Sequence, residues 1–175
     1  DDRTSRGLGD VYKRQFLNIA GDDAMAHISG ACVGDGDFHH DDTVFVTHDA
    51  VGSESRQVFK KVLRNGATGV FQGKILVKPD AQKTDGYQIS QSLLLDEDSQ
   101  FLAKPELEIY ADDVACSHGS TSGAIDEDAL FYLTSRGISK PVAIDMLTMA
   151  FLAEAVDEID NDNFCLLYTS DAADD

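Results

Sequence analysis

Residues 110–123 bring together side-chain types that metal and cluster chemistry often uses. The sequence there is YADDVACSHGSTSG, with a thiol at Cys116, an imidazole at His118, two adjacent carboxylates and a glycine-rich end. If the segment is extended, Cys116 and His118 lie on the same face, because side chains i and i+2 point the same way along a strand. A thiolate beside an imidazole predicts half of a metal or iron–sulfur site.

The other half of such a site is missing from the sequence. Structural zinc sites and iron–sulfur clusters usually have about four protein ligands. The chain has no C-x-x-C motif, and its other cysteines are Cys32 and Cys165. If Cys116 and His118 bind a metal or a cluster, a second polypeptide must complete the site.

The composition indicates a globular protein of one domain. The chain has 175 residues, of which 42% are hydrophobic and 26% are charged, and this length can bury a sizeable core. The net charge of −18 repels nucleic-acid phosphates and anionic membrane surfaces, so we expect no nucleic acid and no membrane as partners. No apolar run approaches the roughly 20 residues that span a bilayer, and the start does not predict a secretory signal. Three widely spaced cysteines fit a reducing compartment, so we expect a cytoplasmic protein.

We expect residues 1–15 and 164–175 to be non-native ends. The first segment shows no hydrophobic period, the second is unlike what precedes it, and both resemble translated adapter or vector sequence. The rest of the chain divides into a β-rich body over residues 16–124 and a helical segment over residues 125–163.

The body is predicted to consist of short strands. Gly-Asp pairs separate the first pieces, and later pieces follow one another at steps of 18 and 15 residues. The apolar or alternating pieces cover residues 16–20, 27–33, 42–48, 69–77, 87–95 and 106–110. Residues 53–63 predict a helical or irregular excursion. Short strands at such steps, without intervening helices, predict the coils of a β-helix or a β-sandwich.

Three polar features of the body predict ordinary structural roles. Cys32 is expected to be a packed core thiol. Residues 39–42, HHDD, contain metal-ligand types, but adjacent strand residues point to opposite faces, so we expect a solvated turn. A solvated face is also expected for four basic residues, Arg56, Lys60, Lys61 and Arg64.

Two helices are predicted after Ile125. Asp126 is the expected N-cap of the first helix, which has acids in its first turn and stops at Gly137. Ser139 is the expected cap of the second, with Pro141 tolerated in its first turn. Steps of four and three residues give the second helix one apolar stripe, formed by Val142, Met146, Met149, Ala153 and Val156. We expect this small hairpin to bury its stripe on the β-rich body, between the helices or on another subunit.

The common catalytic and nucleotide-binding motifs are absent. The motif G-x-x-x-x-G-K-[ST] would need glycine and a hydroxyl where the chain has Thr68 and Ile75. Asp112 and Asp113 would diverge on a strand, so they could not flank a glycosidic bond without help. We therefore expect no nucleotide on this chain and no catalysis by the chain alone.

A family resemblance extends over about residues 16–163. The segments that carry it are KTDG at 83–86, SLLL at 92–95, KPELEIYADDV at 104–114, CSHG at 116–119, LFYL at 130–133 and SRGI at 135–138. They resemble the C-terminal part of the SufB/SufD family of the Suf iron–sulfur cluster assembly system, closer to SufD. The resemblance implies a mainly β fold, a right-handed parallel β-helix (solenoid) followed by a small C-terminal helical hairpin domain. The family has a longer N-terminal region, so we expect this chain to be a fragment.

The resemblance also implies a function, that of a non-catalytic scaffold subunit for iron–sulfur cluster assembly. In the family, SufB and SufD pair through their β-helices, and each carries a SufC ATPase on its helical domain, here residues 125–163. His118, the histidine of the CSHG motif, would bind a transient cluster shared with SufB at the interface. Cys116 would be the weaker ligand.

Two other functions remain open from the residues. A β-helical polysaccharide-acting enzyme could use Asp112, Asp113 or residues 39–42, but it would need a cleft lined by aromatics, and the chain has no tryptophan. A purely structural partner would have His118 hydrogen-bonded and facing the solenoid interior, with Cys116 as a packed thiol. The scaffold function needs His118 on the face offered to SufB.

Overall fold

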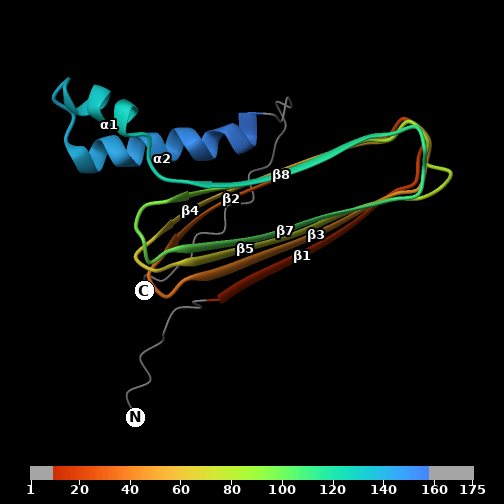
Figure 1. The fold of residues 1–175 in the computed structure, drawn as a ribbon, viewed down its shortest axis with the longest axis horizontal. Helices are drawn as coiled ribbons and strands as arrows, with labels where there is room; N and C mark the ends of the chain where they lie inside the picture. Colours follow the sequence, from red (N-terminus) through yellow and green to blue (C-terminus); the bar gives the residue numbers. More distant parts are fainter. Residues whose placement is uncertain (1–9, 158–175) are drawn as a thin grey trace, which may run out of the picture.

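The computed structural model describes residues 10–157, which form a β-solenoid with two helices at its C-terminal end (Figure 1). The strands are β1 (Asp10–Ile19), β2 (Met25–Asp35), β3 (His39–His48), β4 (Glu54–Arg64), β5 (Thr68–Val77), β6 (Asp85–Leu94), β7 (Gln100–Ile109) and β8 (Ala115–Gly123). The helices are α1 (Glu127–Thr134) and α2 (Lys140–Asp157).

Successive strands alternate between two parallel sheets. One sheet has the order β1-β3-β5-β7 and the other the order β2-β4-β6-β8. Along the first sheet, His39 pairs with Asp10 on one side and with Thr68 on the other, so a structural position recurs once per coil. Strands wound in this way make a solenoid of about four coils. The predicted β-helix is therefore confirmed, and the alternative of a β-sandwich is wrong, because sandwich sheets are antiparallel.

Apolar side chains fill much of the space between the two sheets. Val44, Val46 and Phe71 of the first sheet form a core cluster with Phe59 of the second, and the rings of Phe59 and Phe71 lie 4.9 Å apart. Further along the solenoid, Ile75 belongs to a second cluster that extends to the coil of β7 and β8. Each fully buried side chain of this size contributes about 1.5–3 kcal/mol, so these two clusters hold the sheets together.

Residues 53–63 are strand β4 and its approach, and the prediction of a helical or irregular excursion there is wrong. The buried inward positions of β4 are partly polar and partly apolar: Ser55, Gln57, Phe59, Lys61 and Leu63. These polar side chains at inward positions remove the apolar alternation by which a strand is detected. Burial also overturns the solvated face for two of the four basic residues, since Lys60 is 3% exposed and Lys61 1%, whereas Arg64 is exposed.

Strands β1 and β3 begin earlier than the sequence suggested. β3 starts at His39, so residues 39–42 lie in a strand and not in a solvated turn. β1 starts at Asp10 and pairs with β3 along its length. The β-rich body therefore includes residues 10–15, which the sequence predicts to be part of a non-native end.

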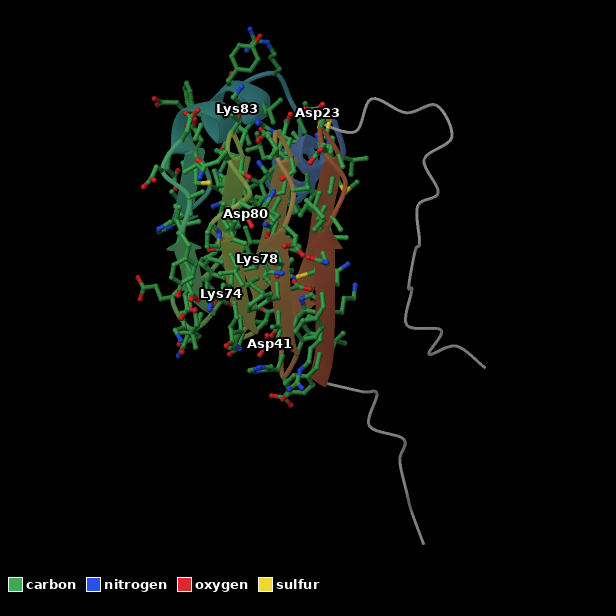
Figure 2. The ribbon with its side chains drawn as sticks, turned by 90° about the vertical axis from the view of Figure 1, so that its right-hand side faces the viewer. Asp23, Asp41, Lys74, Lys78, Asp80 and Lys83 are labelled. Carbon is green, nitrogen blue, oxygen red and sulfur yellow. The ribbon has the colours of Figure 1, made fainter. Side chains whose placement is uncertain are left out.

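The turns at one end of the solenoid stack coil on coil. Asp23 and Lys83 have positive φ angles of 54° and 62°, and Figure 2 shows both residues at this end. The N–H of Asp23 donates to the carbonyl of Val51, and that of Gly52 donates to the carbonyl of Gln82, at 2.9 and 2.8 Å. Gly52 also has a positive φ, and a Cβ there would overlap the Asp23 carboxylate, so glycine is required.

Helix α1 begins as predicted. The Asp126 carboxylate accepts hydrogen bonds from the N–H groups of Asp128 and Ala129 at 2.9 and 3.1 Å, which is the geometry of an N-cap. The turn after α1 contains Gly137 with a φ of 86°, the left-handed conformation that glycine adopts without strain.

Helix α2 packs across the outer face of the second sheet, against β2 and β4 (Figure 1). Lys60 on β4 contacts the Glu154 carboxylate and lies 4.4 Å from the centre of the Phe151 ring. The predicted apolar stripe is not the face that packs here, because Val142, Met146 and Met149 are about half exposed or more. None of the helices within residues 10–157 is long and apolar enough to cross a membrane.

Candidate functional site

Cys116 and His118 lie on β8, the last strand of the second sheet. In the register with β6, Cys116 pairs with Gly86 and His118 with Gln88. Gly86 and Gln88 are buried inward positions of β6, so Cys116 and His118 occupy the same inward row one coil later. The predicted sharing of one face is confirmed.

His118 is exposed although it belongs to an inward row. Within the described residues, β8 pairs only with β6, and no coil covers the open end of the solenoid beyond β7 and β8. The side chain has no hydrogen-bond or ion-pair partner in this part of the chain. At this last coil, a histidine that faces the solenoid interior is also open to a partner. The orientation of His118 therefore does not separate the scaffold function from the purely structural one.

Cys116 has a different environment from His118. Its side chain packs against the apolar cluster that contains Ile75 and Val77. Burial raises the pKa of the Cys116 thiol, and the Asp85 carboxylate adds to the increase, while a backbone hydrogen bond from Gly86 opposes it. A raised thiol pKa lowers the thiolate fraction at neutral pH, and the thiolate is the form that binds metals. The raised pKa therefore makes Cys116 a poorer candidate ligand at neutral pH.

The column of side chains leading to His118 was not predicted from the sequence. Gln57 on β4 pairs with Gln88, and Gln88 pairs with His118. Both glutamines are fully buried, and the Gln88 Nε2 donates to the Gln57 Oε1 at 2.9 Å. The sequence spacing could have revealed this column, because Gln57 and Gln88 lie 31 positions apart and Gln88 and His118 lie 30 apart, and each spacing is the length of one coil.

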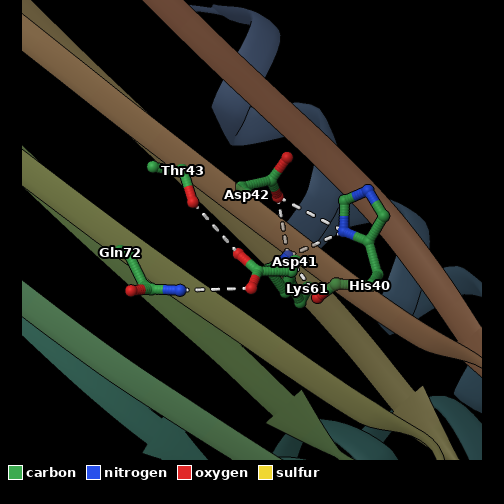
Figure 3. Close-up of polar contacts among 6 residues, drawn as sticks. All are labelled: His40, Asp41, Asp42, Thr43, Lys61 and Gln72. Atoms are coloured by element: carbon green, nitrogen blue, oxygen red, sulfur yellow. Dashed lines mark hydrogen bonds and ion pairs between the residues drawn. The ribbon is translucent and has the colours of Figure 1, made fainter. Parts of the chain in front are cut away.

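A second polar cluster lies inside the solenoid, far along the chain from His118 (Figure 3). The Lys61 Nζ donates to the Asp42 Oδ2 at 2.6 Å and to the His40 Nδ1 at 2.7 Å. All three side chains are buried, and burial, followed by the positive charge of Lys61, lowers the pKa of His40 to about 4. Asp41 lies on the opposite face of β3, where it accepts a hydrogen bond from Gln72. At pH 7 the His40 imidazole is therefore neutral, and it lies beside the buried Lys61–Asp42 ion pair.

Cys32 and His48 also line this interior. Cys32 pairs in register with Lys61, and burial raises the pKa of the Cys32 thiol to about 11, which makes it unreactive at neutral pH. The His48 ring nitrogens bond the Ser53 and Ser55 hydroxyls at 2.7 and 2.8 Å, and burial lowers the pKa of His48 to about 4. These contacts indicate structural roles for both residues.

The residues considered for a polysaccharide-acting enzyme do not form one accessible site in the described structure. Asp112 and Asp113 are exposed beyond the end of β7, while His40 and Asp42 are 4% and 6% exposed and closed off by Lys61. A polysaccharide could not reach the buried pair.

No single group of described residues forms a complete metal site. Within residues 10–157, no three side chains of the His, Cys, Asp or Glu type converge as metal ligands. His118 and Cys116 can supply at most two of the roughly four ligands that a cluster needs. A cluster bound here must take its other ligands from elsewhere.

Comparison with known proteins shows the family of this chain. The family model described as "SUF system FeS cluster assembly, SufBD core domain" matches residues 4–151. The iron–sulfur cluster assembly protein SufD of Escherichia coli K12 is 41% identical over 119 residues, which are 68% of this chain and 28% of that protein. SufD of Bacillus subtilis 168 is 31% identical over 151 residues, 86% of this chain and 35% of that protein.

A chloroplast relative extends the match to plants. The protein named ABCI7, chloroplastic, of Arabidopsis thaliana is 38% identical over 108 residues, 61% of this chain and 23% of that protein. The chain thus spans about a third or less of the length of these three relatives. The family model covers most of the chain, including β8 and both helices up to residue 151, and the chain therefore belongs to the SufB/SufD family of Suf-system iron–sulfur cluster assembly proteins and resembles SufD.

Proposed function

We propose that this chain is a non-catalytic scaffold subunit for iron–sulfur cluster assembly, in which His118 binds the nascent cluster at an interface with SufB. The observation that carries the proposal is the state of His118: an exposed imidazole that has no partner among residues 10–157, on the last strand of an open solenoid end. The cluster is transient cargo shared between two subunits. SufB supplies the ligands that this chain lacks, and Cys116 is at most an auxiliary ligand.

Strand edges at the same end support pairing with SufB through the β-helix. Within the described residues, β7 pairs only with β5, and β8 only with β6. Their outer edges offer backbone N–H and C=O groups to a further strand, which is how two sheets join edge to edge. A partner solenoid docked on these edges covers His118 and places its own side chains beside it.

The exposed apolar side chains of the helical hairpin support docking of the SufC ATPase. Phe131 and Tyr132 on α1, and Val142, Met146 and Met149 on α2, have exposed fractions between 48% and 72%. Apolar and aromatic side chains of this kind are enriched at the centres of protein interfaces. Nucleotide binds to SufC and not to this chain, and assembly takes place in the cytoplasm.

The buried polar cluster supports a non-catalytic role. Lys61, Asp42 and His40 have the residue types of a catalytic site. However, Lys61 and Asp42 neutralise each other's charge, Lys61 also bonds the His40 ring, and all three are buried where a substrate cannot reach them. Their contribution is to stability, and the chemistry of assembly takes place at the subunit interface.

Cluster assembly on the complete complex tests the proposal. Full-length protein with His118→Ala is combined with SufB and SufC, supplied anaerobically with iron and sulfide, and followed by ultraviolet–visible absorption. We expect loss of most of the cluster absorbance while gel filtration shows the complex intact. The matched control is His27→Ala, which removes another exposed strand histidine, on β2.

Each result has one meaning. If His27→Ala retains the cluster and His118→Ala loses it, the imidazole of His118 is part of the site. If His118→Ala forms a cluster of unchanged intensity and stability, His118 is no ligand, and the chain is a structural partner only.

A further inference from the structure

The column Gln57, Gln88, His118 contains an unsatisfied polar atom next to the proposed ligand. Gln88 Nε2 donates to Gln57 Oε1, but Gln88 Oε1 has no hydrogen-bond partner among residues 10–157. Gln88 is 0% exposed, so water does not replace that partner at the surface. A buried acceptor without a donor destabilises the fold, because it has lost its hydrogen bonds to water.

The opposite sheet provides the space for this amide. Gly73 on β5 faces Gln88, and a Cβ at Gly73 would overlap the Gln88 amide group. An apolar side chain in place of Gln88 would fill the interior without an unpaired oxygen. The combination of glycine and glutamine therefore indicates that the Gln88 oxygen has a donor in the assembled protein.

His118 is the next side chain in the column and carries at least one ring N–H in every protonation state. Adjacent strands lie about 4.7–4.9 Å apart, which is within reach of a glutamine and a histidine on the same face. Two further pairs in the same inward rows of β6 and β8 already bond across this distance: Ser90 with Ser120 at 3.3 Å, and Ser92 with Ser122 at 2.8 Å.

We propose that the Gln88 Oε1 accepts a hydrogen bond from an imidazole N–H of His118 and so fixes which ring nitrogen is offered to iron. The inference rests on the proposed function of His118 as a ligand. A histidine that binds a metal through one nitrogen generally donates its other N–H to a nearby acceptor, which fixes the tautomer and the ring orientation. Gln88 is a positioning residue, and Gln57 holds its amide in place.

The test uses full-length protein in complex with SufB and SufC, with ¹⁵N-labelled histidine. Solid-state NMR of the iron-free complex reports the tautomer of His118, identified by the signal that His118→Gln removes. Cluster retention against a chelator is measured on the loaded complex. The variants are Gln88→Met, which keeps length but removes the acceptor, and Gln88→Glu, which restores an acceptor oxygen.

A matched control is available on the same strand. Gln91 faces outward on β6, where its Nε2 donates to the Thr121 hydroxyl at 3.4 Å, so Gln91→Met removes an equivalent side chain from the other face. We expect Gln88→Met to change the tautomer ratio by about tenfold, the value of one ordinary hydrogen bond. We expect cluster retention to fall by about 10–100-fold, as for other residues that orient a metal ligand. Gln88→Glu should restore both, and Gln91→Met should change neither.

The outcomes separate the two proposals. If His118→Gln loses the cluster but Gln88→Met leaves the tautomer and retention unchanged, the positioning role is wrong and the ligand role stands. If His118→Gln keeps the cluster, the ligand role is wrong, and with it the assignment of Gln88. If Gln88→Met disrupts the complex, Gln88→Asn takes its place, since it keeps the amide but withdraws the oxygen by one methylene, and the same two readouts decide.

Discussion

Replacement of Lys61 by methionine is expected to destabilise the solenoid strongly. Lys61 is 1% exposed, and its ammonium group donates to the Asp42 carboxylate at 2.6 Å and to the His40 ring at 2.7 Å. It also donates to the His40 carbonyl at 3.3 Å. Methionine keeps most of the aliphatic stem but leaves the carboxylate of Asp42, 6% exposed, without its cation. Breaking a buried ion pair in this way costs about 3–5 kcal/mol.

A double variant separates the stranded charge from the loss of packing. Lys61→Met with Asp42→Asn removes both charges, and the new amide can donate to His40 Nδ1, which lies 3.3 Å from the Asp42 oxygen in the native protein. Pairs replaced together by uncharged groups are often nearly neutral, so we expect the double variant to cost about 1–2 kcal/mol.

Urea unfolding of the full-length protein, followed by far-ultraviolet circular dichroism at neutral pH, measures both variants. The matched control is Lys60→Met on the neighbouring residue, whose partner Glu154 is 66% exposed, so its loss should cost less than about 1 kcal/mol. The reasoning fails if Lys61→Met costs no more than Lys60→Met, or if adding Asp42→Asn recovers nothing.

Two further predictions concern His48 and Met149. The pKa of His48 is lowered to about 4 by burial, so below pH 6.5 the unfolded chain binds a proton that the folded chain does not. Stability should therefore fall by about 2 kcal/mol between pH 7 and pH 5 from this residue, and urea unfolding of His48→Gln should show a correspondingly weaker dependence on pH. Met149→Asp should weaken SufC binding at least tenfold without a change in Tm, because Met149 is 65% exposed and only a docked partner would bury the new charge; equal SufC binding by gel filtration and calorimetry would remove Met149 from the docking surface.

The parts of the fold that follow simple periodicity could be predicted from the sequence. Strands β5 and β6 have apolar or alternating stretches bounded by turn residues, and α1 has an N-cap aspartate and a terminal glycine. Local sequence decides these elements, because side-chain spacing and capping hydrogen bonds act within a few residues. His118 and Cys116 could likewise be assigned to one face from their i, i+2 spacing.

The elements that were missed depend on contacts with other strands. Ser55, Gln57 and Lys61 point inward on β4 and find partners on other strands: His48 and the His40–Asp42 pair on β3, and Gln88 on β6. Nothing in the sequence of β4 alone distinguishes such residues from solvent-exposed ones. The face on which α2 packs was also missed, since the helix has apolar residues on more than one side and the shape of the second sheet selects among them.

The polar interior also supports the proposed functional end at β8. In the coil of β3 and β4, the side chains of Lys61, Asp42 and His40 bond one another. Between this coil and the next, the Gln57–Gln88 pair leaves the Gln57 Nε2 and the Gln88 Oε1 unpaired among the described residues. In the last coil, His118 is exposed and its side chain has no hydrogen bond within residues 10–157. The unpaired groups of this column thus continue to the end whose strand edges are open, where the proposed bond from His118 satisfies the Gln88 oxygen and another subunit shares the cluster with His118.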